Sequence, residues 1–320
     1  MEEYRKVMKS AVPYLQVAAA MLIVGSFIIV NKMIVRTFPV FLASELRLLT
    51  GAIIMTLLLL AREGRFPTLT KKDWVVLFFQ SFIGVFLFSF FMLYGLTYTT
   101  ALESGIITSM TPVMVGLISL LFFRERLRWN QTAGIVCAVL GALAINIFGG
   151  MFNTSWSLHT LWGNLLVLLA VAGEGVFLTF GKLVSKQVSP IAIATMTSLL
   201  GSAFFLPFAA YNAASFDFAA VSATDWLLVL YTGVVITVIA TILLNQGMAK
   251  ISAGSSAAFT ALMPLSTIVM SALFLHESFF WYHFLGIAFV FAGIAFATLP
   301  SSRTKRRTSV AAQSKGYEGL

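Results

Sequence analysis

The sequence predicts an all-α integral membrane protein whose ten transmembrane helices form two inverted five-helix repeats. The first observation is composition: 59% of the 320 residues are hydrophobic, 10% are charged and 30 are phenylalanine. So few polar residues could not cover the surface of a water-soluble domain. The second observation is a series of apolar runs, each long enough to cross a bilayer. The third is a match of the chain to itself at a spacing of about 150 residues.

The apolar runs define the predicted helices in order. A hydrocarbon core about 30 Å thick needs roughly 20 helical residues, and the sequence lacks the alternating polarity of membrane strands. The first run is as long as a span and has no small-residue cleavage site before the second, so we expect it to stay attached. The ten predicted spans are 13–35, 38–61, 74–97, 104–123, 129–148, 162–184, 190–211, 226–247, 254–275 and 281–299.

Matching residues divide the chain into a first repeat over 1–150, a second over 151–300 and a basic, disordered cytoplasmic tail over 301–320. Asp73 and Asp225 are one matching pair. Each precedes a tryptophan at the start of a span, where we expect the aspartate to be the helix N-cap. Further pairs, 150 to 152 residues apart, are Gly25 with Gly175, Lys32 with Lys182, Gly51 with Gly201, Gly95 with Gly247, Pro112 with Pro264 and Glu125 with Glu277.

The positive charges set the predicted orientation. Most of the 21 Lys and Arg residues fall in alternate connections and in the tail, with Lys32 and Arg36 on the opposite side. The positive-inside rule then places both termini in the cytoplasm, for a multi-pass protein of the plasma (bacterial cytoplasmic) membrane. Because each repeat holds an odd number of helices, the second is inverted relative to the first. Topology and anionic lipids account for the +9 net charge, and no nucleic-acid partner is expected.

The fourth and ninth spans each carry a mid-span proline beside small and hydroxyl residues, Gly105 among them. Pro112 and Pro264 cannot donate to the carbonyl four residues back, which belongs to Thr108 in one copy and Thr260 in the other. An unsatisfied carbonyl inside a membrane costs several kcal/mol. We expect a kink in each helix, which either lines the substrate path or only shapes helix packing.

These features resemble the EamA family of the drug/metabolite transporter superfamily. The residues that carry the resemblance are Pro112, Glu125, Gly134 and Gly141 in the first copy and Pro264, Glu277, Gly286 and Gly293 in the second. The resemblance covers residues 15–300 and is specific for the fold. It implies a carrier of small molecules, commonly an exporter of amino acids or other metabolites, although the family also includes uptake systems and exchangers.

Ionisable residues inside spans are candidates for function because a charge at mid-membrane costs roughly 2.5 to 3.5 kcal/mol. Arg47 matches the family pattern, which implies a structural tie to Glu45 or to helix carbonyls, with substrate contact as the alternative. Glu174 departs from that pattern and lies between two glycines. We expect it to exchange a proton that drives transport, to bind a cationic substrate, or to make an interhelical hydrogen bond. Glu45 and Glu103 are further coupling candidates, although Glu103 also fits a solvated charge at a helix N-terminus.

Polar residues elsewhere complete the candidate site. Tyr94, Asn245 and Gln246 offer neutral hydrogen-bonding groups at depth. Lys32 attracts an anionic group or extends to the lipid headgroups. Glu125 and Glu277 fall on opposite faces of the predicted membrane protein, as matched gates of an alternating-access carrier would.

We therefore expect a secondary transporter that exports an amino acid or similar small metabolite by alternating access, with proton coupling as a hypothesis. The alternatives are an uptake carrier or a sugar-phosphate-type exchanger, which needs several buried Lys or Arg. A membrane enzyme or a passive channel is disfavoured, since the sequence shows no metal-ligand cluster, Ser/His/Asp set or glycine-rich phosphate loop. We expect no cofactor or metal, and a monomer or homodimer.

Overall fold

A computed structural model describes residues 2–123, 129, 132–133, 136–137, 140–141, 143–144, 147–148, 158–185, 187–248 and 262–298. Every regular element within these ranges is helical. Six of the described helices are long and apolar enough to cross a membrane, and two shorter apolar helices follow them. The fifth predicted span is described only in part, and the first residues of the ninth, 254–261, lie outside the described residues. The all-helical membrane fold is thus confirmed for the described part of the chain.

The elements follow the predicted spans in order. The first half contains α1 (Glu2–Ile34), α2 (Val40–Glu63), α3 (Lys71–Ser81), the π-helix η1 (Phe82–Leu87), α4 (Phe88–Tyr98), α5 (Ala101–Thr108) and α6 (Thr111–Phe123). The second half contains α8 (Leu158–Phe180), the 3₁₀ turn η2 (Gly181–Leu183), α9 (Pro190–Ser215), the 3₁₀ turn η3 (Phe218–Ala220), α10 (Ala223–Leu230), the π-helix η4 (Tyr231–Ala240), α11 (Thr241–Met248), α13 (Leu262–Leu275) and α14 (Trp281–Thr298).

The third span of each half begins with the same kind of cap, which differs from the predicted one. Thr70 is the N-cap of α3: its hydroxyl accepts the N–H of Asp73 at 3.2 Å, and the Asp73 carboxylate accepts the N–H of Thr70 at 3.1 Å. Ser222 caps α10 and accepts the N–H of Asp225 at 3.2 Å. The prediction that Asp73 and Asp225 are N-caps was wrong. Each is the third residue of its helix. The Asp73 carboxylate completes a capping box with Thr70, whereas the Asp225 carboxylate accepts the Ser222 hydroxyl at 2.7 Å.

These two spans are also interrupted at corresponding places by π-helical segments. The segment η1 separates α3 from α4, and η4 separates α10 from α11. Residues 82–87 correspond to 234–239 at the repeat spacing of 152. A π-bulge adds a residue to one turn and often marks a functional site. Hydrophobic runs do not record this irregularity, because every residue of both segments is compatible with an α-helix.

The fourth span is broken, as its proline predicts. Helix α5 ends at Thr108 and α6 begins at Thr111, so residues 109 and 110 form a turn between two helices. Pro112 is the second residue of α6. It therefore lies in the first turn of a helix, where the missing N–H costs least. Pro264 lies in α13, close to where the described residues resume.

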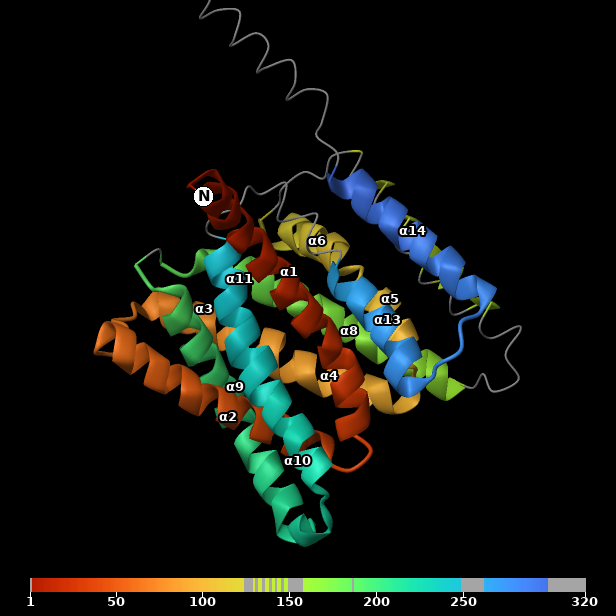
Figure 1. Ribbon diagram of the computed structural model, residues 1–320. Coiled ribbons are helices and arrows are strands. Elements are labelled where there is room, and N and C mark those ends of the chain that lie inside the picture. The colour runs from red at the N-terminus through yellow and green to blue at the C-terminus, as the bar shows by residue number, and fades with distance from the viewer. Residues whose placement is uncertain are drawn as a thin grey trace, which may run out of the picture.

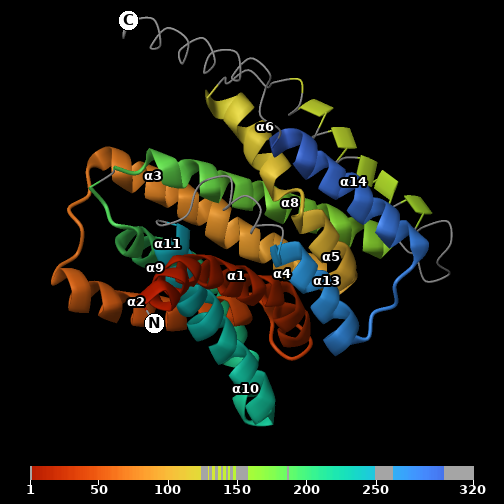
Figure 2. The same ribbon diagram turned by 45° about the horizontal axis from the view of Figure 1, so that its top comes forward.

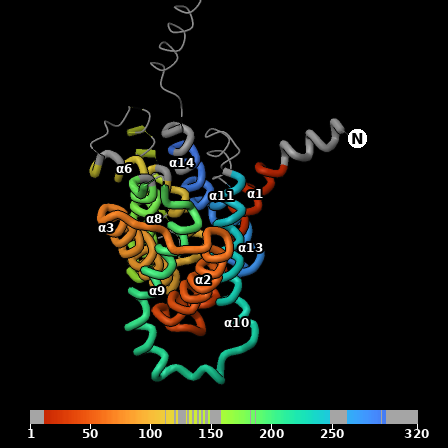
Figure 3. The backbone as a smooth tube through the Cα atoms, turned by 90° about the vertical axis from the view of Figure 1, so that its left-hand side faces the viewer, coloured from red at the N-terminus to blue at the C-terminus, as the bar shows by residue number. Residues whose placement is uncertain are grey.

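Helices from the two halves alternate in the bundle. Helix α1 lies beside α11 and α13 of the second half, and α8 lies beside α4 and α6 of the first (Figures 1 and 2). Helices α2 and α9 pack against each other across the same boundary. The connection between α9 and α10 projects from one end of the bundle (Figure 3). Neither half packs as a separate domain.

Small residues allow these contacts, and they do so in matched pairs. A methyl group at Gly95 would lie 2.8 Å from Cγ2 of Val167, and one at Gly247 would lie 2.5 Å from Cγ2 of Val17. Gly95 and Gly247 are 152 residues apart, and Val17 and Val167 are 150 apart. Close backbone approach at small residues is the usual way that helices associate in membranes. The two contacts therefore join equivalent positions of the two halves.

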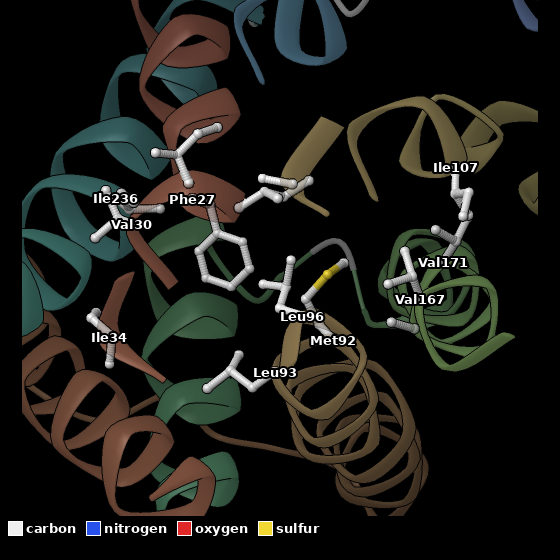
Figure 4. Packing of buried hydrophobic residues seen from close by; sticks show 14 of the residues in the cluster. Phe27, Val30, Ile34, Met92, Leu93, Leu96, Ile107, Val167, Val171 and Ile236 are labelled. Carbon is white, nitrogen blue, oxygen red and sulfur yellow. The ribbon is translucent and has the colours of Figure 1, made fainter. Parts of the chain in front are cut away.

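The buried core lies where the halves meet. Phe27 and Val30 of α1, Met92 and Leu96 of α4, and Val167 of α8 belong to one cluster of buried apolar side chains (Figure 4). Leu96 and Val167 are fully buried. In a membrane, close packing of this kind holds helices together. The hydrophobic effect does not, because the surrounding lipid is as apolar as the side chains.

Candidate substrate cavity

A cavity of about 520 Å³ lies between the two halves, next to the buried core. Its volume is within the range of small-molecule sites, and its wall is mostly apolar with a few polar groups, as in such sites. The polar side chains that line it are Arg47, Gln80, Ser89, Thr108, Glu174, Thr197, Ser198, Thr237, Thr241 and Asn245. Among the predicted residues, the cavity therefore unites Arg47, Thr108, Glu174 and Asn245.

Residues at matching positions of the two halves line the cavity, but its charged side chains have uncharged counterparts. Gly84 and Val85 of η1 line the cavity, and so do their counterparts Ile236 and Thr237 of η4. Both π-helical segments thus face the same space. By contrast, Arg47 corresponds to Thr197 and Glu174 to Val24, which also line it. Among the described lining residues, a nearly symmetric wall carries one cationic and one acidic side chain, each supplied by only one half.

Arg47 is not held by the predicted ion pair. Its Nη2 donates to Oγ of Ser89 at 2.8 Å, and its guanidinium carbon lies 5.3 Å from the centre of the Phe27 ring. Within the described part of the chain, Glu45 bonds elsewhere: its Oε1 accepts the Ser202 hydroxyl at 2.6 Å, and its Oε2 is buried without a partner. Residues two apart on a helix do not face each other. The prediction of a tie to Glu45 was therefore wrong, and a hydroxyl replaces the expected carboxylate or carbonyl.

Glu174 contacts the helix break. Oγ1 of Thr111 lies 2.7 Å from Oε2 of Glu174 and 2.8 Å from the carbonyl oxygen of Thr108. That carbonyl is the one that Pro112 leaves without its helical donor. The three groups join α8 to the point where α5 gives way to α6. The carbonyl of Thr108 thus lacks its helical donor, as predicted. It accepts a hydrogen bond from the hydroxyl of Thr111, the residue before the proline.

One end of the cavity reaches the helix termini. Gly181 and Pro190, which flank the connection between α8 and α9, line the cavity together with Asn245 near the end of α11. This is also the end at which α11 meets the N-terminal half of α1, since Gly247 packs against Val17. The cavity is therefore bounded on this side by residues near the ends of three helices.

At the opposite end of the bundle, a set of hydrogen bonds, here called the closure, joins helices around the turn between α4 and α5. The Glu277 carboxylate accepts the backbone N–H of Ala101 at 2.9 Å and that of Leu102 at 2.7 Å. Ser271 donates to Oε2 of Glu277 at 2.5 Å. A carboxylate at the start of a helix satisfies N–H groups that lack helical partners and is favoured by the helix dipole. Glu277 thus fastens the end of α13 to the start of α5.

Lys32 joins the same closure from α1. Its ammonium donates to the carbonyl of Thr99 at 2.5 Å and to the carbonyl of Leu96. Glu103 is buried there and accepts the Thr99 hydroxyl at 2.6 Å, and that hydroxyl also contacts Oδ1 of Asn164. Lys32 and Glu103 therefore belong to a buried polar cluster at one end of the bundle. Neither is among the residues that line the cavity.

The remaining predicted residues lie in other places. Tyr94 packs between the rings of Phe41 and Phe90, and Gln246 accepts a bond from Gln16 at 3.1 Å. A methyl group at Gly105 would meet Thr267 at 2.7 Å, so this glycine allows α5 to approach α13. Thr260 and Glu125 lie outside the described residues. The residues of the described part contain no group of three or more metal-ligating side chains.

Sequence reasoning missed Ser89, Thr111 and Thr99. Each is a small hydroxyl residue in an apolar run, where hydropathy treats it as a neutral filler. The signal that could have found Thr111 is its position next to Pro112, within one turn of the freed carbonyl. Ser89 and Thr99 had no such signal, because their partners come from other helices.

Comparisons with known proteins agree with this architecture. The sequence model of the EamA-like transporter family matches residues 12–147 and again 161–299. The uncharacterized transporter YetK of Bacillus subtilis is 46% identical over 281 residues, which cover 88% of this chain and 85% of that protein. A probable terminal-alkyne amino-acid exporter of Streptantibioticus cattleyicolor is 27% identical over 184 residues, covering 58% and 59% of the two chains.

A solved crystal structure shares the fold. It superposes with a TM-score of 0.61 and 19% sequence identity, covering 91% of this chain and 97% of its own. The two matches to the family model span both halves of the sequence, and the relatives are named as transporters. The protein is a multi-pass membrane protein of the EamA-like transporter family, within the drug/metabolite transporters.

Proposed function

We propose that this protein is a secondary transporter that exports an amino acid or a similar small metabolite by alternating access. The observation that carries the proposal is the placement of Arg47 and Glu174, one cationic and one acidic side chain, in the wall of one cavity between the two halves. A substrate that bears a carboxylate and an ammonium group would find a partner of opposite charge for each. Export is supported by the relative named as a probable amino-acid exporter.

Arg47 is the proposed partner of the substrate carboxylate. In the described part of the chain, Ser89 is the hydrogen-bond acceptor of its guanidinium, and no carboxylate lies within ion-pair distance. A cation inside a membrane is costly without a counter-ion. The planar guanidinium fork binds a carboxylate through two parallel hydrogen bonds. Phe27, Phe88 and Phe177 in the same wall leave apolar room for a side chain.

A sugar-phosphate exchanger fits this cavity less well. Among the described lining residues, Arg47 supplies the positive charge, whereas a phosphate dianion calls for several cationic donors. A monocarboxylate or zwitterion matches one guanidinium.

We infer that the chain forms ten helices in two inverted repeats, 1–150 and 151–300, with cytoplasmic termini. The matched π-helical segments, hydroxyl N-caps and glycine contacts support equivalent repeats. In the orientation that the positive charges favour, the end at Gly181 and Pro190 faces the cytoplasm, and the closure at Lys32 and Glu277 faces outside. This arrangement is inward-facing, and exchange of the two repeat conformations gives the outward-facing one.

Glu174 is the proposed proton-coupling residue. It lines the cavity and is half-buried within a membrane span, where a charged side chain is costly. A carboxyl group that is neutral in one conformation and charged in another couples proton binding to the conformational change. Glu45 and Glu103 are less suited, because neither is among the residues that line the cavity.

Transport by purified protein in liposomes tests the proposal. The probes are L-leucine, L-leucinamide, which lacks the carboxylate, and isocaproate, which lacks the ammonium group. The wild type is expected to transport leucine in preference to both analogues. Arg47→Gln is expected to lose leucine transport and the preference for leucine over leucinamide, and Arg47→Lys to keep part of each. Arg36→Gln, which removes an exposed cation outside the cavity, is the matched control.

Two outcomes would contradict the proposal. If no apolar amino acid moves under any imposed gradient, the carrier role for amino acids fails. If leucine moves but Arg47→Gln keeps the full preference for leucine over leucinamide, Arg47 does not bind the carboxylate.

A further inference from the structure

The Thr111 hydroxyl lies between two acceptors and has one proton to donate. The distances are 2.7 Å to Oε2 of Glu174 and 2.8 Å to the carbonyl oxygen of Thr108, both of hydrogen-bond length. A hydroxyl donates one hydrogen and accepts through its lone pairs. If Glu174 is a carboxylate, Thr111 can satisfy the carboxylate or the carbonyl, but not both.

A protonated Glu174 removes this conflict. Its O–H then donates to Oγ1 of Thr111, and the Thr111 hydroxyl donates to the Thr108 carbonyl. All three groups are satisfied in one chain of hydrogen bonds. Loss of the proton turns the Thr111 hydroxyl toward the carboxylate, since a charged acceptor binds more strongly than a neutral one. The Thr108 carbonyl then loses its donor.

The Thr108 carbonyl has no ready replacement donor. Pro112 cannot supply the helical N–H, and in the described part of the chain the bond from Thr111 is the one that this carbonyl accepts across the break. Ser109 and Met110, in the turn, donate their N–H groups to Ile106 and Ile107 instead. Buried carbonyls in a membrane must find a donor, so a change at Thr111 favours a change in the helix break.

We propose that Thr111 is the positioning residue that couples protonation of Glu174 to the break between α5 and α6. The inference rests on the proposed proton-coupled transport and adds the element that responds to the proton. Protonated Glu174 favours the present arrangement of the break, and deprotonation favours a different one. The device joins the two halves and is not duplicated by the internal repeat, because the counterpart of Thr111 is Met263 and that of Glu174 is Val24.

Several of the other ionisable groups near α8 have contacts of their own. Arg47 shares the cavity with Glu174 and bonds to Ser89. The ionisable residues of α8 and of the helices packed against it are His159 and Glu174 on α8, Lys71, Lys72 and Asp73 on α3, Tyr94 and Tyr98 on α4, Glu103 on α5 and Lys182 on η2. Tyr98 stacks on His159, Asp73 bonds to Thr70 and Ser185, and Glu103 to Thr99.

The test compares the pH profile of leucine transport in four variants with that of the wild type. Thr111→Ser keeps the hydroxyl, Thr111→Val removes it at nearly constant shape, and Glu174→Gln removes the titrating group. Thr179→Val is the matched control: this buried threonine of α8 donates to the Gly175 carbonyl at 2.6 Å and is not a lining residue. We expect Thr111→Ser and Thr179→Val to keep the wild-type pH dependence. Thr111→Val is expected to lose it, as Glu174→Gln does.

A second measurement separates the hydrogen-bond chain from transport. Infrared difference spectroscopy during a pH titration detects the carbonyl stretch of a protonated carboxyl, assigned to Glu174 by its absence in Glu174→Gln. We expect this band to shift to higher frequency in Thr111→Val and to stay in place in Thr179→Val.

Each outcome has a defined meaning. If the Thr111→Val pH profile superimposes on that of the wild type, or its band does not shift, the coupling role of Thr111 is overturned. If wild-type transport does not depend on pH but the band shifts as expected, the hydrogen-bond chain is supported and proton-driven transport, as proposed above, fails.

Discussion

The Glu277 carboxylate accepts the backbone N–H of Leu102 at 2.7 Å, across 175 residues of sequence. A second bond from Ala101 makes the contact bidentate. Through it the end of α13 holds the start of α5, on the opposite side of the cavity from Gly181 and Pro190. In a carrier that alternates between two states, such a contact belongs to one state and must break in the other.

Removal of this contact is expected to open the cavity toward the Lys32 end. Glu277→Gln keeps one acceptor oxygen and Glu277→Ala keeps none, so alanine is expected to have the larger effect. A hydrogen bond to a charged group contributes about 1.5 to 3 kcal/mol, which corresponds to a shift of about tenfold or more in the population of the closed state. The measurement is the rate at which a membrane-impermeant maleimide, added from outside, labels Val24→Cys in a Cys137→Ser background.

The control is Asp217→Asn, an exposed carboxylate that caps the short turn η3 near the same end of the bundle. Unchanged labelling in Glu277→Ala, with an intact fold by thermal unfolding, would show that the contact does not close the cavity. Faster labelling from the cytoplasmic side alone would show that the proposed orientation is reversed.

The matched glycines are expected to resist substitution in both halves. A methyl group at Gly247 would lie 2.5 Å from Val17 Cγ2 and 2.8 Å from the Pro13 carbonyl oxygen, closer than the equivalent contacts of Gly95. Overpacking of this kind costs roughly 1 to 3 kcal/mol. We expect both alanine variants to lower the Tm in detergent, and Gly247→Ala to lower it more.

Gly116→Ala is the internal comparison for these variants. Gly116 lies in α6, and a methyl group there meets no described atom within 4 Å. Alanine in a helix is favoured over glycine by roughly 0.5 to 1 kcal/mol, so the Tm is expected to rise slightly. An equal loss of Tm in all three variants would mean that close packing at Gly95 and Gly247 is not the cause.

The N-caps of α3 and α10 are expected to differ in strength. Thr70→Ala and Ser222→Ala each remove an N-cap hydroxyl, at a typical cost of about 1 kcal/mol. The Thr70 box is tied to a second element, because Asp73 is buried and also accepts the N–H of Ser185 at 2.9 Å. Asp225 is only half-buried. Chemical unfolding should therefore show the larger loss of stability for Thr70→Ala, and equal losses would argue against a contribution from Ser185.

The three candidate coupling carboxyls can be separated by amide substitution. We expect Glu174→Gln to abolish the pH dependence of transport, and Glu45→Gln to leave it unchanged, because Glu45 bonds to Ser202 outside the cavity. Glu103→Gln is expected to act on the closure through Thr99 rather than on the pH dependence. If Glu45→Gln lost the pH dependence of transport and Glu174→Gln kept that of the wild type, Glu45 rather than Glu174 would be the coupling residue.

The sequence by itself determined the membrane environment, the helix order and the internal repeat. These depend on composition and on contiguous runs, because about 20 apolar residues suffice to specify a span. It also located the helix break, since Pro112 removes a particular N–H from a particular carbonyl. The sequence placed the helix cap only approximately, because it indicated Asp73 as the N-cap of α3, whereas the N-cap is Thr70.

Only the tertiary structure decided which polar groups meet. Arg47 bonds to Ser89 rather than to Glu45, Glu277 reaches the N–H of Leu102, and Thr111 bridges Glu174 and Thr108. Each of these contacts depends on how helices distant in sequence are rotated and placed against one another. The spacing of these residues along the chain does not specify that geometry. The packing is selected because an unpaired polar group in the bilayer costs free energy, so the helices settle where their polar groups are paired.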